Sequence, residues 1–390
     1  MKSNGTSRLP LVVILSLSGF ITGCIHSAAK SGSQDQMGSR KAVAKARFPP
    51  TVTTGADGRA YVRVYYATDR RANPVATIRA EYGGTQNATG GLDYGSAVIS
   101  IPPGHHMGGL EQPSFWVLQF SENPDKHIVI SSASRQSSSD FFNDVSASVA
   151  KSTEKDAFVF VHGYRVTFDE AIMQTGQIAY DLNFSGAPIV YSWPSTGTLE
   201  GYTADEDSIR WTVDHLSEFL KEVSERSHAR SIHLIAHSMG NRALLDALKQ
   251  LSDRHEQAHF KELVMAAPDI SVSEFRQDIP RVTNMVSQIT LYASSKDEAL
   301  ILSHKVNQYQ RAGDTNGGVT IVPPVETIDA SHVDTGIIGH SYFSGPTVLG
   351  DIYYLLKFGN APKDRTRLRS VTSNGKTYWA FVPAVHWWLW

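Results

Sequence analysis

The sequence predicts an α/β fold, in which helices cover both faces of a mostly parallel sheet. From about residue 142 onward, short apolar segments alternate with stretches of helical periodicity. The apolar segments lack alternating polar positions, as is typical of strands buried on both faces. Composition agrees with this prediction, because 390 residues with 41% hydrophobic and 19% charged side chains are ordinary for a globular protein with a large core.

The charge balance argues against nucleic acid as a partner. The formal net charge is -2, from 36 basic and 38 acidic residues, and the basic residues are scattered along the chain. Nucleic-acid-binding domains instead gather Lys and Arg on one face.

The N-terminal sequence predicts an export signal. Lys2 and Arg8 precede an apolar segment over residues 9–20, which is too short to span a bilayer but fits the core of a signal peptide. The segment ends in Ile-Thr-Gly-Cys, and Cys24 is the only cysteine of the chain. This arrangement resembles the lipobox of bacterial lipoproteins, which implies removal of residues 1–23 and acylation of Cys24. A cleaved soluble export signal is the alternative.

The lipobox resemblance also implies a location. Several acyl chains on Cys24 would anchor the protein firmly to the bacterial cell envelope. Ile25 follows Cys24, where an aspartate would resemble an inner-membrane retention signal, so the outer membrane is expected.

Three regions follow the signal peptide. Residues 24–58 are rich in Ser, Ala, Gly and Lys without an apolar period, which predicts a flexible tether. Residues 59–140 contain short β-rich segments between Gly, Pro and Asn clusters, which predicts a β-rich extension. Residues 141–390 carry the alternating pattern. Its expected strands are 156–161, 187–193, 231–236, 262–267, 287–293 and 325–328, and its expected helices are 168–182, 204–226, one after residue 238, 297–307 and 346–357.

The segment Ala-His-Ser-Met-Gly over 236–240 fits a nucleophile elbow. In such an elbow a serine lies on a strained turn between strand and helix, and small residues are needed two positions before and after it. Ala236 and Gly240 are those small residues, although glycine is commoner at the first position. Since Ser238 lies between a predicted parallel strand and a helix, we expect it to be a nucleophile rather than a helix cap.

A serine nucleophile needs a base, and an imidazole base needs a carboxylate partner. On this kind of sheet the acid and the histidine follow the serine in the chain. Asp297, just past a strand, is the preferred acid, and Asp269 is the rival that could equally cap the next helix. His340, in the loop after the last predicted strand, is the preferred base, and His332 is its competitor.

The oxyanion of acyl transfer needs preorganised N–H donors. Met239 offers one at the positive end of its helix. The segment His-Gly-Tyr at 162–164 follows a strand, and its glycine permits a turn, so we assign the second donor to Tyr164. A simple turn at the end of the strand is the alternative reading of this segment.

Together these motifs resemble the α/β-hydrolase superfamily, and specifically a bacterial family of uncharacterised esterase/lipase-like proteins. The resemblance rests on His-Gly-Tyr, Ala-His-Ser-Met-Gly, the segment "TLYASSKDEAL" and a late Gly-His-Ser-Tyr, and it covers residues 60–358. It implies the α/β-hydrolase fold with an N-terminal β-rich extension. It also implies a serine hydrolase that cleaves small-molecule or lipid carboxylic esters through an acyl-enzyme, without cofactor or metal. An acyltransferase, an amidase or a non-catalytic binding lipoprotein are the alternatives.

Two further features receive structural interpretations. His105 and His106 are adjacent in a Gly/Pro loop without a third spaced ligand, so we expect them to be exposed rather than metal-binding. The aromatic segment 385–390, with Trp379 nearby, predicts an edge strand.

Overall fold

The computed structural model describes residues 51–74, 81–112, 122–297, 300, 303, 308–333 and 345–382. All of them belong to residues 47–390, the second of two units into which the chain divides. Cys24, the signal peptide, His340 and the segment 385–390 lie outside the described residues, as does most of the predicted helix 297–307.

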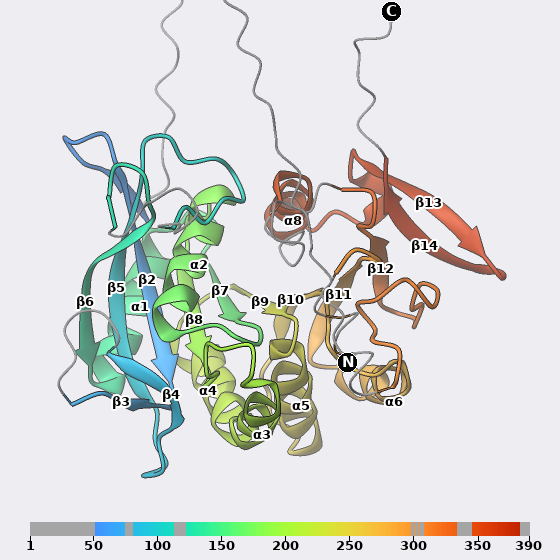
Figure 1. The fold of residues 1–390 in the computed structure, drawn as a ribbon, viewed down its shortest axis with the longest axis horizontal. Coiled ribbons are helices and arrows are strands. Elements are labelled where there is room, and N and C mark those ends of the chain that lie inside the picture. The colour runs from blue at the N-terminus through green and yellow to red at the C-terminus, as the bar shows by residue number, and fades with distance from the viewer. Residues whose placement is uncertain are drawn as a thin grey trace, which may run out of the picture. The chain divides into compact units, whose positions relative to one another are not determined.

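A twelve-stranded mixed sheet forms the centre of the described structure, in the order β13-β14-β12-β11-β10-β9-β7-β8-β2-β5-β6, with β1 paired to β2 (Figure 1). Every neighbouring pair from β2 to β14 along this order is parallel, which confirms the predicted α/β class. The strands are β1 (Val52–Thr54), β2 (Ala60–Thr68), β5 (Asp93–Ile101), β6 (Val129–Gln136), β7 (Asp156–Val161), β8 (Ala187–Ser192), β9 (Ser231–His237), β10 (Phe260–Ala266), β11 (Val286–Ala293), β12 (Glu326–Asp329), β13 (Leu368–Ser373) and β14 (Lys376–Phe381). A separate hairpin joins β3 (Arg70–Ala72) and β4 (Tyr82–Gln86).

Helices cover both faces of the sheet. One face packs against α1, α4, α5 and α6, which contribute Phe141, Leu216, Leu244 and Phe275 to a single buried cluster. The other packs against α2 and α8. The helices are α1 (Ser138–Lys151), α2 (Phe168–Asp181), α3 (Tyr202–Trp211), α4 (Val213–Arg226), α5 (Gly240–Asp253), α6 (Val272–Val282) and α8 (Pro346–Phe358).

The β-rich extension is continuous with the main sheet. Its strand β2 pairs in parallel with β8, and β5 and β6 continue the sheet as antiparallel strands. The end of the predicted tether also belongs to the fold, since Val52 is 5% exposed and β1 pairs with β2. A strand of three residues is too short to show a hydrophobic period, which explains why the sequence did not reveal it.

Local signals fix the helix ends. Thr167 and Glu170 form a reciprocal capping box at the start of α2. The helix α8 starts at Pro346 and ends before Gly359, whose φ of 64° is readily adopted by glycine. The expected helix 204–226 is two helices, α3 and α4, because Thr212 interrupts it and donates its hydroxyl to the buried Asp69.

The hairpin of β13 and β14 was not predicted. Only Ala380 and Phe381 of its two strands are buried, so the sequence lacks the continuous apolar pattern of the central strands. Across the described part of the chain, none of the helices combines the length and apolarity needed to span a bilayer.

Candidate active site

Ser238 lies on a sharp turn between β9 and α5. Its φ of 50° is in the left-handed region, which side chains other than glycine rarely adopt. Its N–H donates to Ala266 O at 2.9 Å, and its carbonyl accepts from the Asn241 and Asp269 N–H groups. Both neighbouring segments therefore hold the strained turn in place, as a nucleophile elbow requires.

Close approach of backbones explains the small residues around Ser238. A Cβ atom on Gly240 would lie 2.3 Å from His162 O and 2.7 Å from Val161 O, so only glycine fits where α5 starts against the end of β7. A Cβ atom on Gly163 would lie 3.0 Å from the Ser238 Cβ. Ala236 is fully buried between Val161 and Met265 of the adjoining strands, so alanine is accommodated at this position.

Asp297 lies at the same edge of the sheet as Ser238. It follows β11, which is two strands from β9, so about 10 Å separates the two strand ends. Its side chain is fully buried, and Oδ1 accepts from the Leu300 N–H at 3.0 Å. Side chains that extend from these two strand ends toward each other leave room for an imidazole between them.

Asp269, the rival acid, is fully engaged elsewhere. Its Oδ2 accepts from Arg242 Nη2 at 3.1 Å and from Tyr202 OH at 3.0 Å. Its Oδ1 accepts from Ser303 Oγ at 2.6 Å and forms an ion pair with Arg311 Nε at 3.1 Å. With both oxygens occupied by two arginines and two hydroxyls, this carboxylate is part of an ion-pair network.

Asp269 does not cap the helix that follows it. Ser271 caps α6, and its side chain accepts from the Glu274 N–H. The Asp269 N–H donates instead to Ser238 O at 3.3 Å.

The two candidate bases follow β12. His332 is exposed in the turn after Asp329, at the end of the strand next to β11. A hydrogen bond joins the segment after β12 to the segment after β11, since the Ser331 hydroxyl accepts from the Ser295 N–H at 2.9 Å. The turn that carries His332 therefore lies beside the segment that leads from β11 to Asp297.

Two backbone amides flank Ser238. Neither the Met239 N–H nor the Tyr164 N–H donates to another part of the described chain. Met239 directly precedes α5, where the positive end of the helix dipole adds to the donor. Tyr164 lies in the turn after β7, next to Gly163.

His162 is buried and neutral. Its ring stacks on Trp193 with centroids 5.1 Å apart, and burial together with the nearby Arg70 charge lowers its pKa well below the ordinary value. The Trp193 indole donates to His162 O at 2.7 Å. This histidine therefore fixes the start of the turn and is not a candidate base.

We expected His105 to be exposed, but the structure buries its side chain. Its side chain is 3% exposed and lies between Glu111, 2.9 Å from Nδ1, and Asp181, 2.8 Å from Nε2. Burial disfavours the imidazolium, but hydrogen bonds to both carboxylates outweigh burial and raise the pKa of His105 to about 9. Within the described residues no group of three or more His, Cys, Asp or Glu side chains could hold a metal ion.

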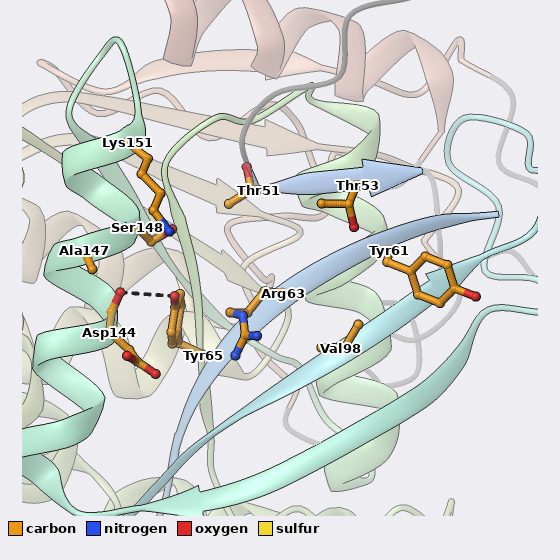
Figure 2. A pocket seen from close by; sticks show the side chains of 10 residues that line it. All are labelled: Thr51, Thr53, Tyr61, Arg63, Tyr65, Val98, Asp144, Ala147, Ser148 and Lys151. Atoms are coloured by element: carbon orange, nitrogen blue, oxygen red, sulfur yellow. Dashed lines mark hydrogen bonds between the residues drawn. The ribbon is translucent and has the colours of Figure 1, made fainter. Parts of the chain in front are cut away.

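A cavity of about 370 Å³ lies on the α1 side of the sheet, between α1 and the strands β1, β2 and β5 (Figure 2). Tyr65 OH donates to Asp144 O across one wall at 3.1 Å. None of the lining residues is a histidine, so the cavity does not contain the imidazole base of a Ser-His-Asp triad. Arg63 on its wall lies five residues before the end of β2, toward the opposite edge of the sheet from Ser238.

The parallel sheet, the covering helices and the strained serine turn define a protein of the α/β-hydrolase fold. Residues 137–352, more than half of the chain, match the family described as "Alpha/beta hydrolase of unknown function (DUF900)". The chain belongs to this family.

Similarity to solved structures is distant. Aspergillus fumigatus lipase B is 11% identical with a TM-score of 0.33, and the match covers 53% of each chain, so this protein spans about half of that lipase. Brefeldin A esterase, a bacterial homologue of human hormone-sensitive lipase, is 12% identical with a TM-score of 0.34 over 74% of this chain and 79% of that one. The Pyrococcus furiosus esterase PF2001 is 15% identical with a TM-score of 0.26 over 53% of this chain and 82% of that one. No curated protein matches the chain.

Proposed function

We propose that this protein is a serine hydrolase that cleaves carboxylic esters through an acyl-enzyme. The observation that carries the proposal is the conformation of Ser238, which is held at a φ of 50° between the end of a buried parallel strand and a helix. Such strain persists only where the surrounding structure enforces it, and it is commonest at functional sites.

In the proposed reaction, the Ser238 hydroxyl attacks the ester carbonyl while His340 removes its proton. Asp297 holds the histidine in the correct tautomer and stabilises its charged form. The N–H groups of Met239 and Tyr164 stabilise the oxyanion of the tetrahedral intermediate. Loss of the alcohol, protonated by the histidine, leaves an acyl-serine, and water attacks this ester to release the acid and regenerate Ser238.

The assignment of the base is tested by single and double substitutions. We expect His340→Ala and Ser238→Ala each to lower kcat by about three to six orders of magnitude, and the double variant to be scarcely worse, because members of a triad act as a unit. His332→Ala is the matched control and should keep most of the activity. An inactive His332→Ala together with an active His340→Ala would transfer the role of base to His332.

We further propose that the protein is a lipoprotein of the bacterial cell envelope, anchored through Cys24 in the outer membrane. The basis is the lone cysteine after a short apolar segment with basic flanking residues. The full-length protein should incorporate labelled fatty acid and partition into detergent, and Cys24→Ser should abolish both. A wild-type protein that stays in the aqueous phase would contradict the anchor.

A further inference from the structure

Arg70, in the β-rich extension, has its guanidinium group inside the protein. The residue is 1% exposed, and each of its five N–H groups has an acceptor. Its Nε donates to Ser192 Oγ at 2.9 Å, and its Nη1 donates to Gly83 O at 3.1 Å and Ser195 O at 2.8 Å. A buried cation with all its donors used is rigid, since any displacement breaks several charge-assisted hydrogen bonds at once.

The remaining two donors of Arg70 bracket the turn that carries Tyr164. Nη2 lies 3.2 Å from His162 Nε2, just before the turn, and donates to Val166 O at 2.8 Å, just after it. One planar guanidinium edge thus fixes the distance between the two ends of the turn.

Arg70 also decides which nitrogen of His162 carries the proton. Because a guanidinium can only donate, His162 Nε2 must accept, and the proton of the neutral ring must be on Nδ1. The Nδ1–H then donates to Gly163 O, 2.9 Å away. Burial lowers the pKa of Arg70 to about 10, which keeps the guanidinium charged at neutral pH.

The bond to Gly163 O sets the orientation of the next amide. The peptide between Gly163 and Tyr164 is trans, so its N–H points opposite to its C=O and away from the His162 ring. Two further bonds hold the rest of the turn: the Arg165 N–H donates to Asp205 Oδ2 at 3.3 Å, and the Val166 N–H donates to Ser195 Oγ at 3.2 Å.

We propose that Arg70 is a positioning residue for the oxyanion site, acting through His162 to direct the Tyr164 N–H toward the oxygen that develops charge. The inference rests on the proposed function, because it assigns a role within that reaction. The proposal also assigns the β-rich extension a role in the reaction, because Arg70 starts β3 and its side chain contacts His162, directly after β7.

The kinetic test compares Arg70→Lys with Arg71→Lys. Lysine keeps the charge but cannot donate in the fork geometry, whereas Arg71 is an exposed neighbour on the same strand. For Arg70→Lys we expect kcat on p-nitrophenyl acetate to fall between 10-fold and 1,000-fold, the range for a misplaced oxyanion donor, with KM within about threefold. The inhibition constant of a trifluoromethyl ketone, which forms a tetrahedral adduct, should rise by the same factor as kcat/KM falls.

These results separate a positioning role from a structural one. A folded Arg70→Lys with unchanged kcat and unchanged ketone inhibition would overturn the proposal, as would a change in KM alone. Arg71→Lys should match the wild type in all three measurements.

A second measurement needs neither activity nor a variant of Arg70. Nitrogen-15 NMR of histidine-labelled wild-type protein, with the His162 signals assigned by loss in His162→Gln, should show a neutral ring with the proton on Nδ1 from pH 6 to 8. A proton on Nε2, or a doubly protonated ring, would overturn the proposal. If the wild type hydrolyses no ester, the proposed function fails, and the NMR result alone decides whether the proton is on Nδ1, as the contact between Arg70 and Nε2 requires.

Discussion

Replacing Gly240 by alanine tests the geometry of the elbow directly. The new Cβ would lie 2.3 Å from His162 O and 2.7 Å from Val161 O, both backbone atoms that cannot rotate away. The helix α5 must therefore move away from β7 and take Ser238 and the Met239 N–H with it. A displacement of about 1 Å in a reacting group lowers turnover by about 100-fold.

The same contacts determine how much Gly240→Ala changes the free energy of unfolding. Overpacking costs about 1–3 kcal/mol, whereas alanine in place of a helical glycine gains about 1 kcal/mol. We therefore expect Gly240→Ala to lower the free energy of unfolding. Gly350 in α8 is the matched control, since a Cβ there meets nothing within 4 Å, and Gly350→Ala should gain about 1 kcal/mol without a change in activity.

The assay combines thermal unfolding with ester turnover for both glycine variants. For a domain of this size 1 kcal/mol corresponds to about 1–2 °C in Tm. Gly240→Ala should lower both Tm and kcat, and Gly350→Ala should raise Tm alone. A Gly240→Ala variant with the wild-type Tm and kcat/KM would refute the close approach of α5 and β7.

Asp269→Asn should destabilise the fold by about 3–5 kcal/mol in urea unfolding, because it leaves Arg311 buried without the Asp269 charge and removes one of the two carboxylate partners of Arg242. Asp297→Asn should remain folded and lose about 10⁴-fold in kcat. The pKa of His105 is about 9 in the folded protein against 6.5 in the unfolded chain, so its contribution to stability is complete below pH 6.5 and is lost as pH rises through 9. Tm should therefore fall as pH rises over this range, and His105→Gln should flatten the dependence of Tm on pH. Burial raises the pKa of Glu262 from 4.5 to about 8, so the folded state binds a proton that the unfolded chain has lost, and stability falls as pH rises from 4.5 to 8. Glu262→Gln should remove this fall, and an unchanged dependence of stability on pH in the variant would contradict the prediction.

The sequence predicted the elements that have strong periodicity. The buried strands β7, β9 and β11 and the helix α8 lie within one or two residues of their expected positions, because continuous apolar segments and caps are local signals. The order of these strands in the sheet also agrees with an α/β fold. Pairing between β2 and β8 was not predicted, since contacts far apart in the chain leave no local pattern.

The same distinction applies to the candidate site. Ser238 could be predicted because its neighbours, Ala236 and Gly240, must be small for a local reason. Arg70 was missed because its partners lie far from it in the chain, at residues 83, 162, 166, 192 and 195. The available signal was a charged pair, Asp69 and Arg70, directly after an apolar strand that ends at the same edge of the sheet as Ser238.

The central claim is that Ser238 is an activated nucleophile. The most direct test is to treat the protein with a fluorophosphonate and to measure the intact mass, followed by peptide mapping of the adduct. We predict one phosphonyl group per chain, on Ser238, and none on Ser238→Ala. No adduct on the wild type, or an adduct on another residue, would contradict the account.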